Sequence, residues 1–137
     1  MDYSEEKHFV RSFIRKERRD RLLYELTTPD KRYDGVSRFC HQAEDFLDRS
    51  KIRLSGDDLE RNPDFRRFVI LHNKPCYILS SDYALNEKNV VLQEAVSLAA
   101  VSPEAVLILS SKFAVVFTEA MKGSRGKYLL CERQPNS

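Results

Sequence analysis

A run of seven consecutive charged residues is the most conspicuous chemical feature of the sequence. In order, these residues are Arg15, Lys16, Glu17, Arg18, Arg19, Asp20 and Arg21. Guanidinium groups bind phosphate and carboxylate groups through paired hydrogen bonds, so the run fits a nucleic acid or an acidic protein surface. It also places opposite charges four positions apart, as in Lys16 with Asp20 and Glu17 with Arg21. That spacing favours the simpler interpretation, a solvent-exposed helical face with internal ion pairs.

Arg18 differs from the other arginines of this run in its position. It lies four residues after Ile14 and four before Leu22, on the side of a helix that is otherwise apolar. The aliphatic stem of such an arginine passes the core, and its guanidinium needs a carboxylate beyond it. We expect that carboxylate to be Glu44 or Asp45, in a structural ion pair. An anchor for a ligand is the alternative role.

A second polar group could supply acid–base chemistry. Asp34, Arg38, His41 and Asp45 follow one another at intervals of four, three and four, which places them along one flank of a helix. A histidine one turn from a carboxylate has the parts of a general base and of the group that orients it. No nucleophile is evident for this base, so pairing between helices is the simpler hypothesis. An enzyme built on Arg38 and His41 is the alternative.

Motifs for cofactors and metals are missing from the sequence. Cys40, Cys76 and Cys131 are more than thirty residues apart, which argues against a disulfide framework and against a zinc site. The four glycines form neither a dinucleotide-binding pattern nor a P-loop, and His8 and His72 belong to no metal-binding motif. We therefore expect no cofactor and no metal. The cysteines are predicted to be buried apolar residues in a reducing compartment.

Two similar segments, Ile78–Ala84 and Ile108–Ala114, each carry a pair of serines directly after an apolar run. Serines at strand ends are a common place for reactive groups. Neither pair matches the motifs of known serine nucleophiles, which need particular neighbours for a sharp turn or for a base. We therefore predict that these serines are turn residues that hydrogen-bond the local backbone.

Length and composition predict one folded domain over residues 1–137. With 42% hydrophobic residues, a chain of this length buries a core without disulfides or metals. Its 23 basic and 21 acidic side chains give a net charge of +2, so it lacks the overall field of a dedicated nucleic-acid binder. The sequence shows neither a secretory signal nor an apolar segment long enough to span a bilayer. We expect a cytoplasmic protein with no membrane partner.

The elements that position these residues begin with two long helices in residues 1–49. Apolar residues at helical spacing predict a first helix from Glu5 to Leu26, started by Ser4. A second helix begins at Pro29, which suits the first position of a helix, and ends near Arg49. Because only a short turn separates them, we predict an antiparallel helical hairpin.

The rest of the chain is predicted to form a sheet. Residues 50–75 are a connector with one short helix or strand. Four apolar segments predict strands at 76–79, 105–109, 113–118 and 128–132. A helix is expected over 87–101, and Gly123–Gly126 is expected to be a hairpin loop. Helices segregated from a mostly antiparallel sheet define an α+β fold, with the hairpin at 1–49 and a strand-rich region at 76–133.

These features favour a small non-catalytic domain that binds another protein, or a second copy of itself as a homodimer. Immunity and antitoxin proteins are one class of such domains. The candidate binding residues are Arg15, Arg18, Arg19, Arg21, Arg38 and His41. Two alternatives stand beside this hypothesis. One is a nucleic-acid-binding module that uses the arginines of the first helix, and the other is an enzyme of unrecognised class that uses Arg38 and His41.

Overall fold

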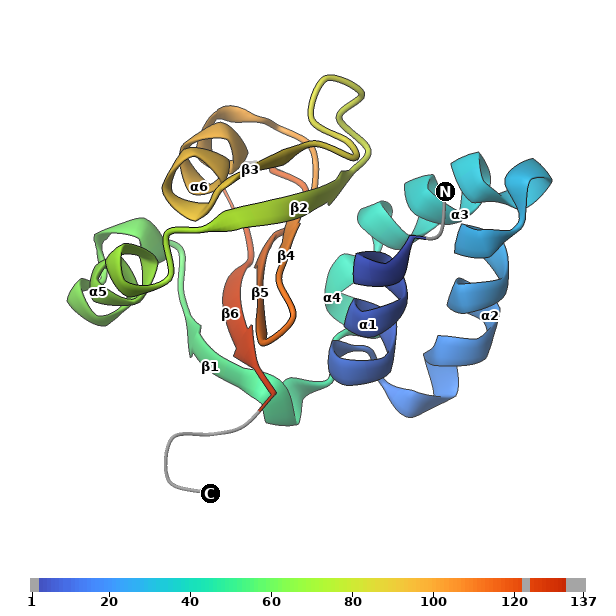
Figure 1. Cartoon of the computed structure of the whole chain (residues 1–137), viewed down its shortest axis with the longest axis horizontal. Helices are drawn as coiled ribbons and strands as arrows, with labels where there is room; N and C mark the ends of the chain where they lie inside the picture. Colours follow the sequence, from blue (N-terminus) through green and yellow to red (C-terminus); the bar gives the residue numbers. More distant parts are fainter. Residues whose placement is uncertain (1–2, 122–123, 133–137) are drawn as a thin grey trace.

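The computed structural model describes residues 3–121 and 124–132 (Figure 1). The helices are α1 (Ser4–Phe13), α2 (Lys16–Thr27), α3 (Pro29–His41), α4 (Ala43–Phe46), α5 (Pro63–Leu71) and α6 (Leu92–Val101), with 3₁₀ turns at Arg49–Lys51 and Leu59–Arg61. The strands are β1 (Ile52–Ser55), β2 (Pro75–Ser80), β3 (Asn89–Val91), β4 (Val106–Leu109), β5 (Phe113–Phe117) and β6 (Lys127–Cys131). Among the described helices, none is long and apolar enough to cross a membrane.

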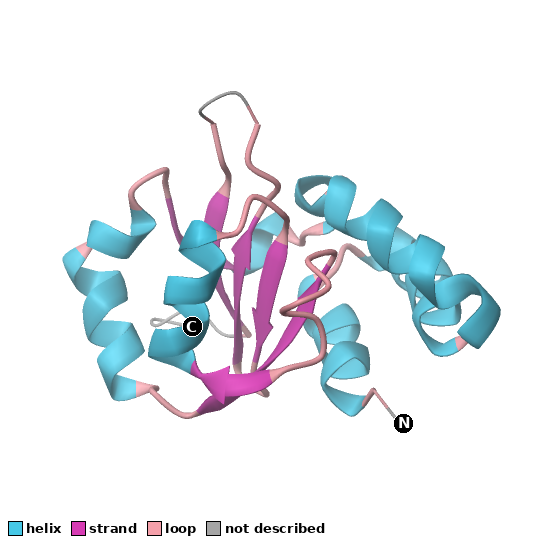
Figure 2. Cartoon of the chain, turned by 90° about the horizontal axis from the view of Figure 1, so that it is seen from above, coloured by secondary structure: helices cyan, strands magenta, loops and turns pink. Residues whose placement is uncertain are grey.

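One antiparallel sheet separates two groups of helices. Its six described strands lie in the order β1-β6-β5-β4-β2-β3. Helices α1 to α4 cover one face, and α5 and α6 cover the other, so the molecule has three layers (Figure 2). Helices α2 and α3 pack side by side as a hairpin. The predicted α+β fold, with a helical hairpin against a mostly antiparallel sheet, is confirmed.

The central strands are buried on both faces, which explains their uninterrupted apolar sequence. In β4, Leu107 and Leu109 belong to the core under α1 to α4, whereas Val106 and Ile108 belong to the core under α5 and α6. This alternation follows from the two-residue period of a strand. The sheet therefore holds the helical hairpin and the α5–α6 pair in fixed positions on its two faces.

The two long helices predicted in residues 1–49 are each broken. Ile14 lies between α1 and α2, and Leu47 follows α4; these two residues form an antiparallel bridge. The bridge is flanked by hydrogen bonds from Arg15 N to Phe46 O at 2.8 Å and from Asp48 N to Phe13 O at 2.8 Å. Residues in such a bridge are extended, so neither helix can continue through it. The predicted helix boundaries at Leu26 and Pro29 agree with the structure, but the continuous helices were wrong.

The sheet has two short edge strands beyond the four predicted ones; the connector was predicted to hold one short helix or strand and holds both, and β3 was not predicted. β1 lies in the segment predicted as a connector, and β3 occupies the start of the helix predicted over 87–101. Both are brief and depend on a distant partner: β1 pairs with β6, and β3 pairs with β2. The same connector contains α5, whose first turn is capped by Asn62 Oδ1. Two positions of the predictions lie outside the described residues: Gly123 in the predicted hairpin loop, and Arg133 at the end of the predicted strand-rich region.

Close packing of the hairpin depends on Gly35. A Cβ atom added at Gly35 would lie 2.7 Å from Cβ of Glu25, which is closer than two carbon atoms can pack. Glycine inside a helix weakens it, so its presence here has a packing reason. In the structure it allows α3 to pack closely against α2. This close packing sets the position of the opposite side of α3.

Candidate functional site

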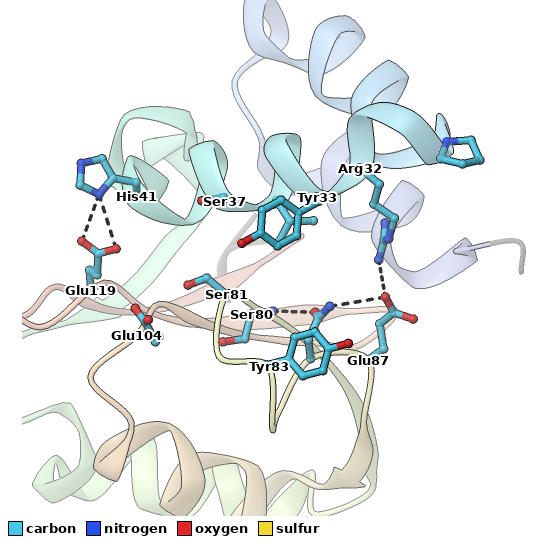
Figure 3. A pocket seen from close by; sticks show the side chains of 13 residues that line it. Arg32, Tyr33, Ser37, His41, Ser80, Ser81, Tyr83, Glu87, Glu104 and Glu119 are labelled. Atoms are coloured by element: carbon cyan, nitrogen blue, oxygen red, sulfur yellow. Dashed lines mark hydrogen bonds and ion pairs between the residues drawn. The ribbon is translucent and has the colours of Figure 1, made fainter.

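A cleft of about 550 Å³ lies between α3 and the chain that links β2 to β3 (Figure 3). The α3 wall is formed by Pro29, Arg32, Tyr33, Val36, Ser37 and His41, and the opposite wall by Ser80, Ser81, Tyr83, Asn86, Glu87, Glu104 and Glu119. Its volume is within the range of small-ligand sites. The lining is mostly polar and comes from four separate parts of the sequence.

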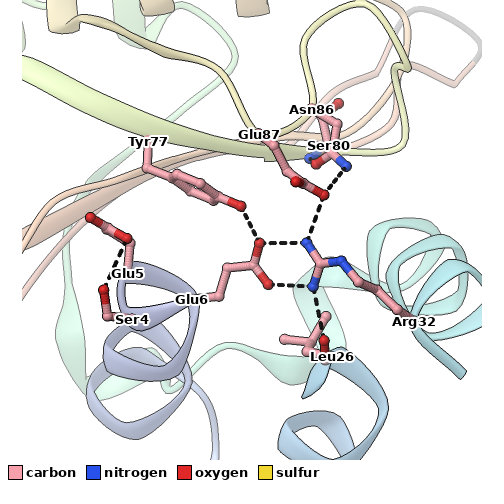
Figure 4. A network of polar contacts seen from close by, with 9 residues as sticks. All are labelled: Ser4, Glu5, Glu6, Leu26, Arg32, Tyr77, Ser80, Asn86 and Glu87. Atoms are coloured by element: carbon pink, nitrogen blue, oxygen red, sulfur yellow. Dashed lines mark hydrogen bonds and ion pairs between the residues drawn. The ribbon is translucent and has the colours of Figure 1, made fainter. Parts of the chain in front are cut away.

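One end of the cleft is closed by a buried polar network (Figure 4). Arg32 donates from both terminal nitrogens to the carboxylate of Glu6, with both distances 2.7 Å, and from Nη2 to Glu87 Oε2 at 3.0 Å. The Tyr77 hydroxyl also donates to Glu6. The network joins α1, α3, β2 and the β2–β3 link. Glu6 is fully buried, so its charge is balanced only inside the protein.

The surroundings of Arg32 and Tyr77 keep both side chains protonated. Burial alone lowers the pKa of Arg32, but its bonds to Glu6 and Glu87 outweigh that effect and raise the pKa above its usual range. Burial and the contact with Glu6 raise the pKa of Tyr77, so its hydroxyl remains a donor. Glu87 has a left-handed backbone, with φ of 64°, which is unusual for a residue other than glycine. Its amide donates to Ile78 O at 2.7 Å, and its side chain contacts Arg32 across the cleft.

The opposite end of the cleft is acidic, and we call it the acidic end (Ser81, Glu104, Glu119 and His41). His41 Nδ1 lies 3.1 Å from Glu119 Oε1. Glu104 is a partly buried residue, and its carboxylate has no hydrogen-bond or ion-pair partner among the described residues. The Ser81 hydroxyl oxygen is buried and makes no well-aligned hydrogen bond to the described residues, although it is close enough to the Cys40 thiol to lower the pKa of that thiol. This end therefore presents two carboxylates to the cleft, and that of Glu104 has no described partner.

Cys40 lies behind the acidic end and is not a nucleophile. Burial raises the pKa of its thiol to about 12; Ser81 opposes this rise, and Glu119 and Glu104 add to it. The thiol therefore stays protonated at neutral pH, and the nucleophilic form is the thiolate. The effects of Ser81, Glu104 and Glu119 on one thiol also indicate that these residues gather around the same point.

Two exposed tyrosines stand on opposite walls of the cleft. Tyr33 projects from α3 and Tyr83 from the β2–β3 link (Figure 3). The exposed fractions of the two residues are 79% and 94%. Large aromatic side chains at this exposure lose apolar contact unless something covers them, so they mark the mouth of the cleft as a surface suited to binding.

The arginines of the charged run lie away from the cleft and contact the protein itself. Three of them form what we call the arginine corner (Arg15, Arg18 and Arg19), where α1 meets α2. Arg15 bonds Glu17 and donates to Asp45 O at 3.1 Å, and Arg19 donates to Ile14 O at 2.8 Å. These contacts fix the break between the two helices.

Arg18 was predicted to pair with Glu44 or Asp45, and this was wrong. Its guanidinium lies over the ring of Phe46, 4.9 Å from the ring centre, in a cation–π contact. The break in the helix turns Arg18 to the surface, where it is exposed and covers the edge of the core. The predicted pairs Lys16–Asp20 and Glu17–Arg21 are replaced by contacts of Arg15 with Glu17 and of Arg21 with Glu25, the latter at 3.7 Å.

Arg38 and His41 point to different places. Arg38 pairs with Glu25 on α2, and its hydrogen bond there lowers the pKa of that carboxylate. His41 lies at the acidic end of the cleft, which Arg38 does not line. His41 and Glu119 have the arrangement of a base and its orienting group, yet no described hydroxyl or thiol hydrogen-bonds the His41 ring. No described cluster of three His, Cys, Asp or Glu residues is arranged to hold a metal ion.

The cleft residues other than His41 were not singled out as a site from the sequence. Glu6 carried a usable signal, because it lies three and seven positions before Phe9 and Phe13, on the apolar stripe of α1. An acidic residue there needs a buried partner. Glu104 and Glu119 carry no such signal, because each follows a regular element and reaches the cleft only through the fold. The two serines after β2 have different surroundings. Ser80 accepts a hydrogen bond from Asp82 N at 2.9 Å, as predicted for a turn, and Ser81 lines the cleft.

No protein-family model matches the chain, and no significant match is found among curated proteins or solved structures.

Proposed function

We propose that this chain is a non-catalytic domain that binds another protein through the surface around the cleft. The observation that carries the proposal is the pair of exposed tyrosines, Tyr33 and Tyr83, on either side of a polar cleft. Tyrosine is enriched in protein interfaces because its ring buries a large apolar area while its hydroxyl keeps a hydrogen bond. Residues of this kind commonly dominate the binding energy of an interface.

The two alternative functions have less support from the geometry. For an enzyme, His41 and Glu119 supply a base, but the described residues offer it no nucleophile, and Arg38 lies elsewhere. For a nucleic-acid binder, the arginines of the charged run would need free guanidinium groups. Those of Arg15, Arg19 and Arg21 already contact groups of the protein.

Loss of both tyrosines tests the proposal. The double variant Tyr33→Ser, Tyr83→Ser and the single variant Tyr24→Ser are compared with the unchanged protein. Tyr24 is the matched control, because it is 58% exposed on α2 and does not line the cleft. Each protein is immobilised, and proteins captured from native lysate are identified and their affinities measured. We expect one captured protein to lose affinity for the double variant by at least about tenfold and to bind the control normally.

Two results bear directly on this experiment. Identical captured proteins and affinities for all three forms, or no captured protein at all, would contradict the proposal. A concentration-dependent dimer in size-exclusion chromatography, lost in the double variant, would identify the partner as a second copy of the chain.

A further inference from the structure

We infer that the acidic end of the cleft receives a positively charged side chain, arginine or lysine, from the partner protein. This inference rests on the proposed function and adds the chemistry of what is bound. It starts from three polar groups of the cleft lining: the carboxylate of Glu104, which has no described partner, the buried hydroxyl of Ser81, and the carboxylate of Glu119, which contacts His41. Each lies in the part of the chain that the structure describes, and they come from three different segments.

Hydrogen-bonding capacity points to a donor as the bound group. Glu104 is a partly buried residue whose carboxylate has no donor among the described residues, so a bound donor gains a charge-assisted hydrogen bond there. The cationic donor groups of the cleft are already engaged: Arg32 bonds Glu6, Glu87 and Leu26 O, and His41 Nδ1 faces Glu119. Lysine and arginine side chains carry only donors, so they complement these groups without leaving an acceptor unpaired.

The charge of the cleft agrees with the same occupant. Three carboxylates and one guanidinium line it, which is a formal excess of two negative charges with His41 neutral. At the closed end, Glu6 and Glu87 share the single positive charge of Arg32, which leaves one negative charge there, and Glu104 and Glu119 add two more at the acidic end. A cation that enters there gains from this local field, which the low-dielectric walls strengthen.

The two exposed tyrosines lie at the mouth of the cleft. Tyr33 and Tyr83 lie on the two walls of the same cleft as Glu104, and aromatic faces attract arginine and lysine through cation–π contacts. The cleft volume of about 550 Å³ leaves room for the flanking chain of the partner as well as for the charged group. The carboxylates and the aromatic rings therefore both favour a cationic side chain as the ligand.

A peptide titration followed by NMR tests the inference on the full chain. The probes are three short capped peptides that carry arginine, lysine or glutamine between glycines. We expect the arginine and lysine peptides to shift the amide signals of Ser81, Glu104 and Glu119, and the glutamine peptide to shift none. Binding should weaken as salt rises from about 0.1 M to about 1 M, where the screening length falls from about 10 Å to about 3 Å.

Two charge-removing variants complete the design. Glu104→Gln should weaken binding of the arginine peptide by about tenfold, because it removes a charge-assisted hydrogen bond. Glu94→Gln on α6 is the matched control: it removes the same charge from an exposed residue on the opposite face of the sheet and should change nothing. Equal shifts with the glutamine peptide, or equal affinity of both variants, would overturn the inference.

The outcomes also separate this inference from the proposed function. If the partner protein depends on Tyr33 and Tyr83 but binds Glu104→Gln as tightly as the unchanged protein, the cationic side chain is wrong and protein binding stands. If the tyrosine variants leave capture unchanged while the arginine peptide binds as expected, the cleft recognises a cation from another source.

Discussion

The arginine corner and the acidic end of the cleft both carry charge, but the fold uses the two regions differently. At the arginine corner, Arg15 and Arg19 bond groups of the protein, and Arg18 covers Phe46. At the acidic end, Glu104 faces the cleft with no described partner. The corner stands out in the sequence because its charges are consecutive. The acidic end is scattered along the chain, and its charges are the ones left available to a ligand.

This difference suggests a general distinction between charge that supports a fold and charge that serves a site. A charged group that supports the fold finds its partner inside the protein, and removing it costs stability. A charged group kept for a ligand lacks that partner, and removing it costs binding. The substitutions below test this distinction, in order of expected effect.

The largest effect is expected at the closed end of the cleft. Arg32→Met leaves the fully buried carboxylate of Glu6 without its cation, so the free energy of unfolding should fall by about 3–5 kcal/mol. Urea unfolding measures the change. Arg38→Met on the same helix is the matched control, because its partner Glu25 retains Arg21 at 3.7 Å. Its loss should stay below about 2 kcal/mol. Equal losses for the two variants would show that burial of Glu6 does not set the cost.

An intermediate effect is expected at the arginine corner. Arg19→Ala removes the bond to Ile14 O, a backbone carbonyl at the break between α1 and α2, and should lower the free energy of unfolding by about 1 kcal/mol. Arg21→Ala is the control; its side chain is 75% exposed, and the change should be within about 0.5 kcal/mol. Neither should alter capture of the partner protein. If Arg19→Ala kept its stability but no longer captured the partner protein, the arginine corner would be a binding site. The contrast between the arginine corner and the acidic end would then fail.

Sequence reasoning succeeded where structure depends on neighbours along the chain. The apolar spacing in Val36, Phe39 and Cys40 predicted α3, and the apolar run from Val106 to Leu109 predicted β4. It failed where a distant partner decides the local conformation. The bridge between Ile14 and Leu47 breaks two helices whose periodicity continues on both sides, and no local pattern marks it.

The site was harder to predict than the fold for the same reason. Its walls come from α3, the β2–β3 link and the residues beside β4 and β5, so its composition follows from the order of strands in the sheet. Among the residues predicted to bind, His41 lines the cleft, and the structure places the arginines elsewhere. The charged run was conspicuous because its residues are consecutive in the sequence. The carboxylates of the acidic end come together only in the folded structure, so they form no pattern in the sequence.

The smallest expected effect is also the most direct test of the distinction. Glu104→Gln removes the charge of a partly buried residue, a charge that has no described partner, so the free energy of unfolding should stay within about 0.5 kcal/mol or rise. Glu119→Gln, which loses the contact with His41, should cost up to about 1 kcal/mol in the same urea measurement. A loss above about 1 kcal/mol for Glu104→Gln would mean that its carboxylate supports the fold. The acidic end would then resemble the arginine corner, and its availability to a ligand would need another explanation.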